Sequence, residues 1–274
     1  MLLLPVLTYH AVGPPLDPSF APFTVSKAQL SEQMAALREA GYRLMSLTAA
    51  LQAYDALALA PRDAIDGTRY VALTFDDGYT DFAEAALPVL QEHKASATLF
   101  VVTDLVGRRA TWLPFAKEQE RPLLSWSDLE ELAQHDIEIG SHGCRHLELD
   151  VIPLETARDE IERSRSEIGA HLPSPTCFAY PFGYHSARVR HLVASAGYSA
   201  ACEVGRGLYP PAADRLRIRR LLIQPDCTPD ALVRRLTGPI QLPADRIREL
   251  ARPIWREVRR GKRSARGLLG RRRP

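Results

Sequence analysis

Short apolar runs alternate with amphipathic patterns along most of the chain. The runs at 3–9, 70–75 and 97–102 are rich in aliphatic, β-branched and aromatic residues, which is typical of buried strands. Between such runs, apolar residues recur at intervals of three and four, as in the helix predicted after Ser26, which has Gln29 at its capping-box position. This alternation predicts a parallel sheet or barrel of the α/β class.

Polar residues follow three of the predicted strands at the point where each strand ends. Asp76 and Asp77 come directly after one apolar run. His142 and His146, four positions apart, follow a second predicted strand, and the turn at 180–183 follows a third. Reacting groups gather at the carboxyl ends of strands in barrel-like α/β folds, so we expect these residues to lie close together.

One acid and two histidines would hold a divalent metal and leave positions open for water and substrate, while a second acid acts as a base. Imidazole and carboxylate ligands suit zinc, and cobalt, nickel or iron would fit the same set. Adjacent acids also occur at helix starts, and histidines of this spacing occur on surfaces. The positions at strand ends favour metal-assisted hydrolysis over these alternatives.

The motifs resemble those of a known family. Thr-Phe-Asp-Asp-Gly at 74–78 and Ser-His-Gly-Cys-Arg-His-Leu at 141–147 are similar to the first two motifs of the polysaccharide deacetylases, the NodB-homology group of carbohydrate esterase family 4. Ala-Tyr-Pro-Phe-Gly at 179–183 resembles the third motif. The resemblance covers residues 3–225 and implies a distorted (β/α) barrel with fewer than eight strands.

The resemblance also implies roles for individual residues. Asp77, His142 and His146 would hold the metal, Asp76 would be the general base, and the reaction would remove N-acetyl groups from amino sugars. A backbone N–H in the turn would hold the oxyanion. The residues predicted to form this turn and to contact the substrate or its oxyanion are Tyr180, Pro181, Phe182 and Gly183.

The chain departs from the family pattern at two places. Ala179 stands where the third motif usually has an Arg that orients the base, and the nearby arginines Arg217, Arg219 and Arg220 are candidates for that role. The usual late Leu-x-His motif is missing. His10, in Leu-Thr-Tyr-His at 7–10, resembles it, as in the rearranged branch with the poly-N-acetylglucosamine deacetylases, and is predicted to be the general acid.

Other aromatic and histidine residues are also assigned places in or around the site. An apolar wall against a sugar ring is predicted for Tyr9, Tyr180, Phe182 and Tyr184, and Trp112 or Trp126 could stack on a sugar in the same way. His185 and His191 are expected on the surface.

The net charge of +2 hides an uneven distribution. From Asp245 to the C-terminus there are eleven Arg and one Lys against three acids, a charge of +9, so the remainder carries −7. We therefore predict a catalytic domain at 1–240 and a basic, amphipathic or disordered tail at 241–274. An anionic membrane surface is a candidate partner of this tail, and nucleic acid is less favoured.

No apolar run approaches the ~20 residues that span a bilayer. The apolar start at 1–7 lacks a basic region and is predicted to be a strand, so the chain is expected in the cytoplasm or peripheral at the inner face of the membrane. The predicted function is metal-dependent N-deacetylation of a polysaccharide, oligosaccharide or lipid-linked glycan. The alternatives are a catalytically silent carbohydrate-binding relative and a deformylase or amidase for another small amide.

Overall fold

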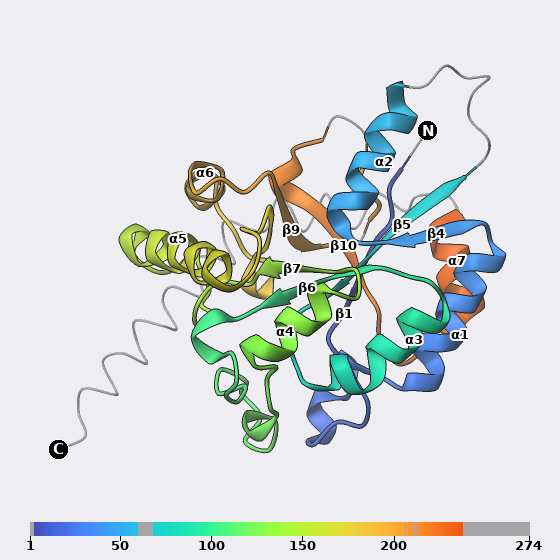
Figure 1. Cartoon of the computed structure of the whole chain (residues 1–274), viewed down its shortest axis with the longest axis horizontal. Coiled ribbons are helices and arrows are strands. Elements are labelled where there is room, and N and C mark those ends of the chain that lie inside the picture. The colour runs from blue at the N-terminus through green and yellow to red at the C-terminus, as the bar shows by residue number, and fades with distance from the viewer. Residues whose placement is uncertain (1–2, 60–67, 206, 211–212, 238–274) are drawn as a thin grey trace.

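The computed structural model describes residues 3–59, 68–205, 207–210 and 213–237, so the predicted tail at 241–274 lies outside the described residues. Within the described part, seven parallel strands close into a barrel, because β1 pairs with both β5 and β10 (Figure 1). The prediction of a distorted barrel with fewer than eight strands is confirmed. The strands of the ring are β1 Val6–Tyr9, β5 Arg69–Phe75, β6 Ala97–Val101, β7 Ile137–Ser141, β8 Cys177–Ala179, β9 Ala200–Gly205 and β10 Ile218–Leu222.

The barrel is distorted where β4 (Tyr42–Met45) joins it. β4 pairs with the first half of β5, and β6 pairs with the last two residues on the same edge, so two strands share one side of β5. A small parallel pair, β2 and β3, lies apart from the main sheet. The bounds of this pair and of the helices are β2 Ala11–Val12, β3 Thr24–Val25, α1 Lys27–Glu39, α2 Leu47–Leu59, α3 Leu87–Glu92, α4 Trp126–Ala133, α5 Leu154–His171, α6 Ala187–Ser195 and α7 Pro229–Thr237.

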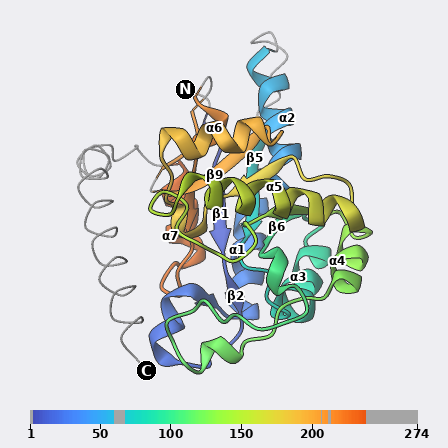
Figure 2. The ribbon, with the colours of Figure 1, turned by 90° about the vertical axis from the view of Figure 1, so that its left-hand side faces the viewer.

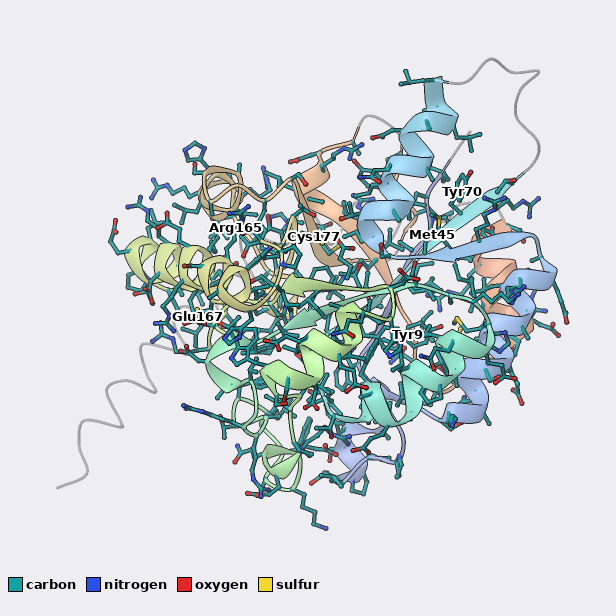
Figure 3. The ribbon with its side chains drawn as sticks, in the orientation of Figure 1. Tyr9, Met45, Tyr70, Arg165, Glu167 and Cys177 are labelled. Atoms are coloured by element: carbon teal, nitrogen blue, oxygen red, sulfur yellow. The ribbon has the colours of Figure 1, made fainter. Side chains whose placement is uncertain are left out.

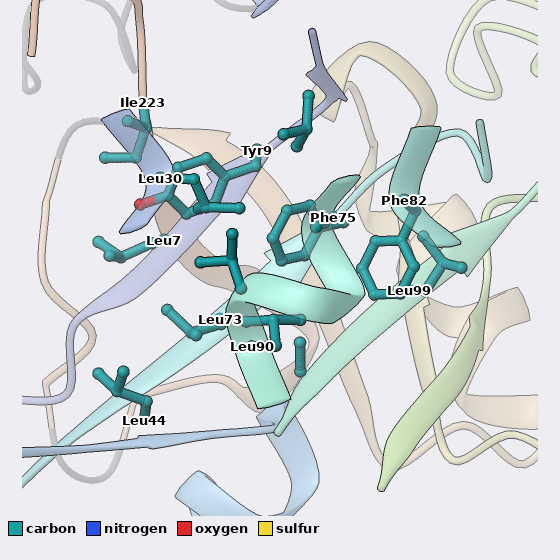
Figure 4. Close-up of a cluster of buried hydrophobic side chains, with 14 of the residues drawn as sticks. Leu7, Tyr9, Leu30, Leu44, Leu73, Phe75, Phe82, Leu90, Leu99 and Ile223 are labelled. Carbon is teal, nitrogen blue, oxygen red and sulfur yellow. The ribbon is translucent and has the colours of Figure 1, made fainter. Parts of the chain in front are cut away.

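The largest hydrophobic core lies between the barrel and the helices around it. Tyr9 and Phe75, on neighbouring strands, stack with ring centroids 5.1 Å apart and pack with Leu30 of α1 and Leu90 of α3 (Figure 4). Because side chains alternate along a strand, the residues between these outward-facing ones point into the barrel. Thr74 is one of these inward-pointing residues. Asp76, two positions further along, is expected to point the same way.

The two ends of the barrel differ. α2 adds Leu47, Leu51 and Tyr54 to the apolar interior and covers the end where the strands begin. The segments at 18–23 and 103–122 lie together at the opposite end (Figures 1 and 2). Buried Glu118, in the second segment, connects it to the residues just before the first, because its carboxylate accepts the backbone N–H groups of Leu16 and Asp17. The end where the strands finish is therefore walled by loops.

In the described part of the chain, no helix combines the length and the apolar character that crossing a membrane requires. The apolar N-terminal run does form a strand, β1, whose four residues are all buried.

Candidate active site

A sharp turn places the two adjacent acids. Phe75 ends β5 facing the outer core, and the next residue, Asp76, is only 2% exposed. Asp77 and Gly78 then both adopt the left-handed conformation, with φ of 77° and 78°. The left-handed φ favours glycine at position 78, where a Cβ would lie 3.2 Å from Cγ1 of Val101 and press on that side chain. The two carboxylates consequently meet different partners.

Asp77 meets the two histidines of the second motif. Its Oδ1 lies 3.6 Å from Nε2 of His142 and 3.3 Å from Nε2 of His146. All three residues are buried, and their ligand atoms lie within 4.8 Å of one another. His142 has its other ring nitrogen, Nδ1, 2.7 Å from the Ala179 carbonyl oxygen. A carbonyl only accepts, so Nδ1 carries the proton and Nε2 keeps a free lone pair facing Asp77.

These three donors fit a divalent metal. Two ligands at about 2.0–2.1 Å from a tetrahedral zinc ion lie roughly 3.4 Å apart, which is close to the spacing found here. Oδ2 of Asp77 accepts a hydrogen bond of 2.7 Å from the Tyr79 hydroxyl, but the buried Oδ1 has no hydrogen-bond partner among the described residues. A buried carboxylate oxygen without a partner is unfavourable, and a cation between the three donors would satisfy it.

The protonation of the donors agrees with this fit. Burial alone would raise the pKa of Asp77, but the close approach and charge of His146, together with His10 and His142, hold it well below its usual range. Burial lowers the pKa of His142 to about 4. At neutral pH the carboxylate is therefore ionised and His142 is neutral, which are the forms that bind metals.

Asp76 faces Arg220 of β10 inside the barrel. Nη1 and Nη2 of Arg220 donate to the two carboxylate oxygens at 2.6 and 2.7 Å, and Nη1 also donates to Oγ1 of Thr74 at 3.1 Å. The Arg220 side chain is completely buried. Burial by itself would raise the pKa of Asp76, but the guanidinium outweighs it and holds the pKa below its ordinary value. Asp76 is consequently ionised and fixed in orientation.

The other two arginine candidates lie elsewhere. The Nε atoms of Arg217 and Arg219 are each 3.8 Å from the buried carboxylate of Glu203, and both side chains are partly exposed. Arg219 flanks Arg220 in β10 and therefore points to the opposite face of the barrel wall. Of the three candidates, only Arg220 contacts Asp76.

The turn after β8 packs closely against the next strand. Phe182 and Gly183 are left-handed, with φ of 58° and 73°. A Cβ on Gly183 would lie 2.4 Å from the backbone N of Val204, so only glycine fits there. The Phe182 ring is 46% exposed and meets His146 edge-on, with centroids 4.6 Å apart. The turn therefore lies beside the candidate metal ligands.

His10 and two loop aromatics complete the surroundings. His10 follows β1, its ring centroid lies 5.5 Å from that of Phe23, and its buried Nδ1 has no hydrogen-bond partner among the described residues. Its electrostatic interaction helps to lower the pKa values of Asp76 and Asp77. Trp112 stacks on His146 with centroids 4.9 Å apart.

Some sequence-based predictions around the site are wrong. Tyr9 and Tyr180 are buried and cannot form an open wall, and the Tyr9 hydroxyl donates to Gln33 of α1. His185 is not a surface residue, because its side chain is only 2% exposed and its Nε2 lies 2.6 Å from Glu203. Trp126 stacks on His171 instead of lining the site. The sequence did contain one indication of a buried partner for His185, because the acid Glu203 lies within the otherwise apolar strand β9.

Comparisons with known proteins agree with this geometry. The sequence profile of the family described as Polysaccharide deacetylase matches residues 64–201. YxkH of Bacillus subtilis, whose name assigns it to the polysaccharide deacetylases, is 27% identical over 213 residues, covering 77% of this chain and 67% of that protein.

Solved structures show the same fold. The Streptococcus pyogenes deacetylase PplD, in complex with acetate, superposes with a TM-score of 0.72 at 24% identity, covering 86% of this chain and 99% of that chain. IcaB from Ammonifex degensii superposes with a TM-score of 0.67 at 20% identity, covering 87% and 98%. Because the profile spans half of the sequence and includes the acidic pair and both histidines, the chain belongs to the polysaccharide deacetylase family, a membership that supports carbohydrate deacetylation as its chemistry.

Proposed function

We propose that this protein is a metal-dependent N-deacetylase that hydrolyses the N-acetyl amide of an amino sugar in a glycan, with zinc as the preferred ion. The observation that carries the proposal is the separation of the two adjacent carboxylates. Asp77 has an unpartnered oxygen facing His142 and His146, whereas Asp76 is held by Arg220. Asp77 is thus available to bind a cation, and Asp76 is available to accept a proton.

A divalent ion held by Asp77, His142 and His146 would supply a Lewis acid that lowers the pKa of water and polarises the acetamide carbonyl. Asp76 would accept the proton of the attacking water. Arg220 holds Asp76 in its ionised form and restricts its rotation, while each carboxylate oxygen keeps a further lone pair for that proton.

The remaining steps use the turn and His10. A backbone N–H of the Pro181–Gly183 turn would donate to the developing oxyanion, and the left-handed Phe182 is the residue at the centre of this turn. His10, in its protonated form, would deliver a proton to the departing sugar amine. Its buried Nδ1, which has no hydrogen-bond partner among the described residues, supports this role.

The contact between Arg220 and Asp76 favours an active enzyme over a silent relative. The absent motif arginine at Ala179 would leave the base unsupported, but Arg220 reaches Asp76 from a different strand and donates to both of its oxygens. Partly exposed rings of Trp112 and Phe182 beside His146 favour a sugar over a small acyclic amide, because a pyranose has an apolar face to place on them.

Two substitutions separate the proposed roles. In Asp76→Asn we expect bound zinc at the wild-type level and amine release from N-acetylglucosamine oligomers reduced about 10²–10⁴-fold, because the general base is lost. In His146→Ala we expect loss of the metal itself, measured by elemental analysis. Chelation of the wild-type protein should abolish amine release, and added zinc should restore it.

The matched controls are Asp230→Asn and His191→Ala, which change the same residue types at exposed positions of α7 and α6. Equal metal loss in Asp76→Asn and His146→Ala would refute the division of roles. A wild-type protein that binds zinc and the oligomers but releases no amine would instead be the silent relative.

The basic tail at 241–274 adds a proposed partner, an anionic membrane that presents a lipid-linked glycan. Its charge of +9 from Asp245 onward supports this contact. Sedimentation with anionic liposomes should fall when residues 245–274 are deleted. Equal sedimentation of both proteins would exclude the tail as the membrane contact.

A further inference from the structure

A buried acid of α5 lies directly beneath the loop that carries His146. Glu160 is 0% exposed, near the middle of the helix on which Arg165 and Glu167 are labelled in Figure 3. Its Oε2 accepts the backbone N–H groups of Cys144 and Arg145 at 3.0 and 2.9 Å. Its Oε1 accepts Nε of Arg145. One carboxylate thus binds two consecutive peptide groups and the side chain between the two histidines.

The rest of this loop is also tied to its surroundings. Gly143 N–H donates to Ser141 Oγ at 3.2 Å, and its carbonyl accepts the N–H of Thr103 at 3.1 Å. The carbonyl of Cys144 accepts the N–H of Asp104 at 3.0 Å. On the other side of the loop, the N–H groups of Cys144 and Arg145 are satisfied by Oε2 of Glu160. A buried carboxylate is retained only where such donors compensate its desolvation.

His146 depends on this loop more than His142 does. His142 is oriented by the bond from its Nδ1 to a backbone carbonyl. Nδ1 of His146 is buried and has no hydrogen-bond partner among the described residues, and its backbone is left-handed with φ 55°. Its ring position therefore rests on the loop backbone and on contacts with Trp112 and Phe182. Metal ligands usually have a fixed partner on their second nitrogen, which His146 lacks.

We propose that Glu160 is a positioning residue for the metal site, which holds the loop 143–146 so that Nε2 of His146 stays at ligand distance from Asp77. This inference rests on the proposed metal-dependent function. Glu160 touches neither substrate nor metal in this role and acts only through His146.

A second group of possible metal ligands lies near this loop, but its acids are already paired with an arginine. Asp104, Cys144 and Glu167 lie close enough to form a second metal site. However, Arg163 is paired with both acids, at 2.5 and 3.1 Å, and the Cys144 thiol donates to the Glu160 carbonyl. The cation of this cluster is thus Arg163.

The test is zinc affinity, measured by competition of the metal-free full chain with a chromophoric chelator. Glu160→Gln replaces one acceptor oxygen by an NH₂ group while keeping the side-chain size. We expect its zinc affinity to fall about 10–100-fold, the usual effect of losing a group that orients a ligand. The cobalt-substituted variant should show an altered d–d absorption spectrum, and excess zinc should recover part of the amine release. Glu162→Gln is the matched control, on the same helix with a 55% exposed side chain.

A second variant and two contrary results complete the test of this role for Glu160. If Glu160→Gln does not fold, Glu160→Asp keeps the charge one methylene further from the loop, and its zinc affinity should fall in the same direction. A folded variant with a lower melting temperature but wild-type zinc affinity and cobalt spectrum would overturn the proposal, because Glu160 would then support only the fold. A wild-type chain that binds no zinc would instead refute the proposed function and this inference together.

Discussion

Replacing Arg220 by Met tests how much the protein's stability depends on the buried ion pair with Asp76. The change removes the guanidinium that donates to both Asp76 oxygens, while the unbranched Met side chain still fills part of the barrel interior. Asp76 is 2% exposed and Arg220 is 0% exposed, so the carboxylate left without its partner stays buried. Breaking a buried pair of this kind costs about 3–5 kcal/mol. We expect the free energy of unfolding of Arg220→Met at pH 7 to fall by that amount.

The loss should depend on pH in a defined direction. In the wild type the Asp76 pKa lies below its unfolded value, so its stabilising contribution is complete above about pH 4 and disappears only as the pH falls further. Without Arg220 we expect burial to outweigh the remaining contributions of His142 and His10 and to raise the Asp76 pKa above the unfolded value. The penalty is then present at neutral pH and shrinks as the pH falls through the raised pKa. The difference between the two proteins should be largest near pH 7 and smallest near pH 4.

Urea unfolding at several pH values, with chelator in every sample so that metal does not contribute, measures this difference. The double variant Asp76→Asn, Arg220→Met should regain much of the lost stability, because no uncompensated charge stays buried. A loss below about 1 kcal/mol at pH 7, or a double variant whose loss equals the sum of the two single losses, would refute the reasoning.

Two other substitutions address the geometry of the site. Gly183→Ala should lower the free energy of unfolding by at least about 2 kcal/mol and reduce amine release, because the left-handed backbone and the 2.4 Å approach to Val204 leave no room for a methyl group; unchanged melting and turnover would show that the turn adapts. Tyr79→Phe should lower zinc affinity about tenfold, because Asp77 Oδ2 loses its hydroxyl donor, and equal chelator competition curves would exclude that role.

Much of the fold was predictable because its signals are local. The capping box at Ser26 and Gln29 is present at the start of α1, and Gly41 beyond its end is left-handed. The pattern at 154–171 predicts a helix over those residues, and α5 spans Leu154–His171. The polar residues after β5 and β7 could be expected at one end of the barrel, because parallel strands of alternating α/β units all finish on the same side.

Other parts of the site depend on registers between distant strands. The arginine that contacts Asp76 was one of three candidates, and only the pairing of β10 with β1 and β9 decided that Arg220 faces the interior. A shift of one residue would have turned Arg219 inward instead. The prediction that His185 lies on the surface was wrong for the same reason. Its partner Glu203 lies on strand β9, and the residues next to His185 in the sequence do not indicate that contact.

The sequence by itself determined the alternating elements, the strand-end acids and histidines, and the family to which they belong, since each of these is written in residues close together along the chain. Only the tertiary structure decided which arginine holds Asp76, that Trp112 stacks on His146, and that Glu160 lies under the loop. These contacts join residues that are far apart in sequence, and they depend on strand register and helix rotation. Both are set by the packing of the whole core rather than by any local pattern.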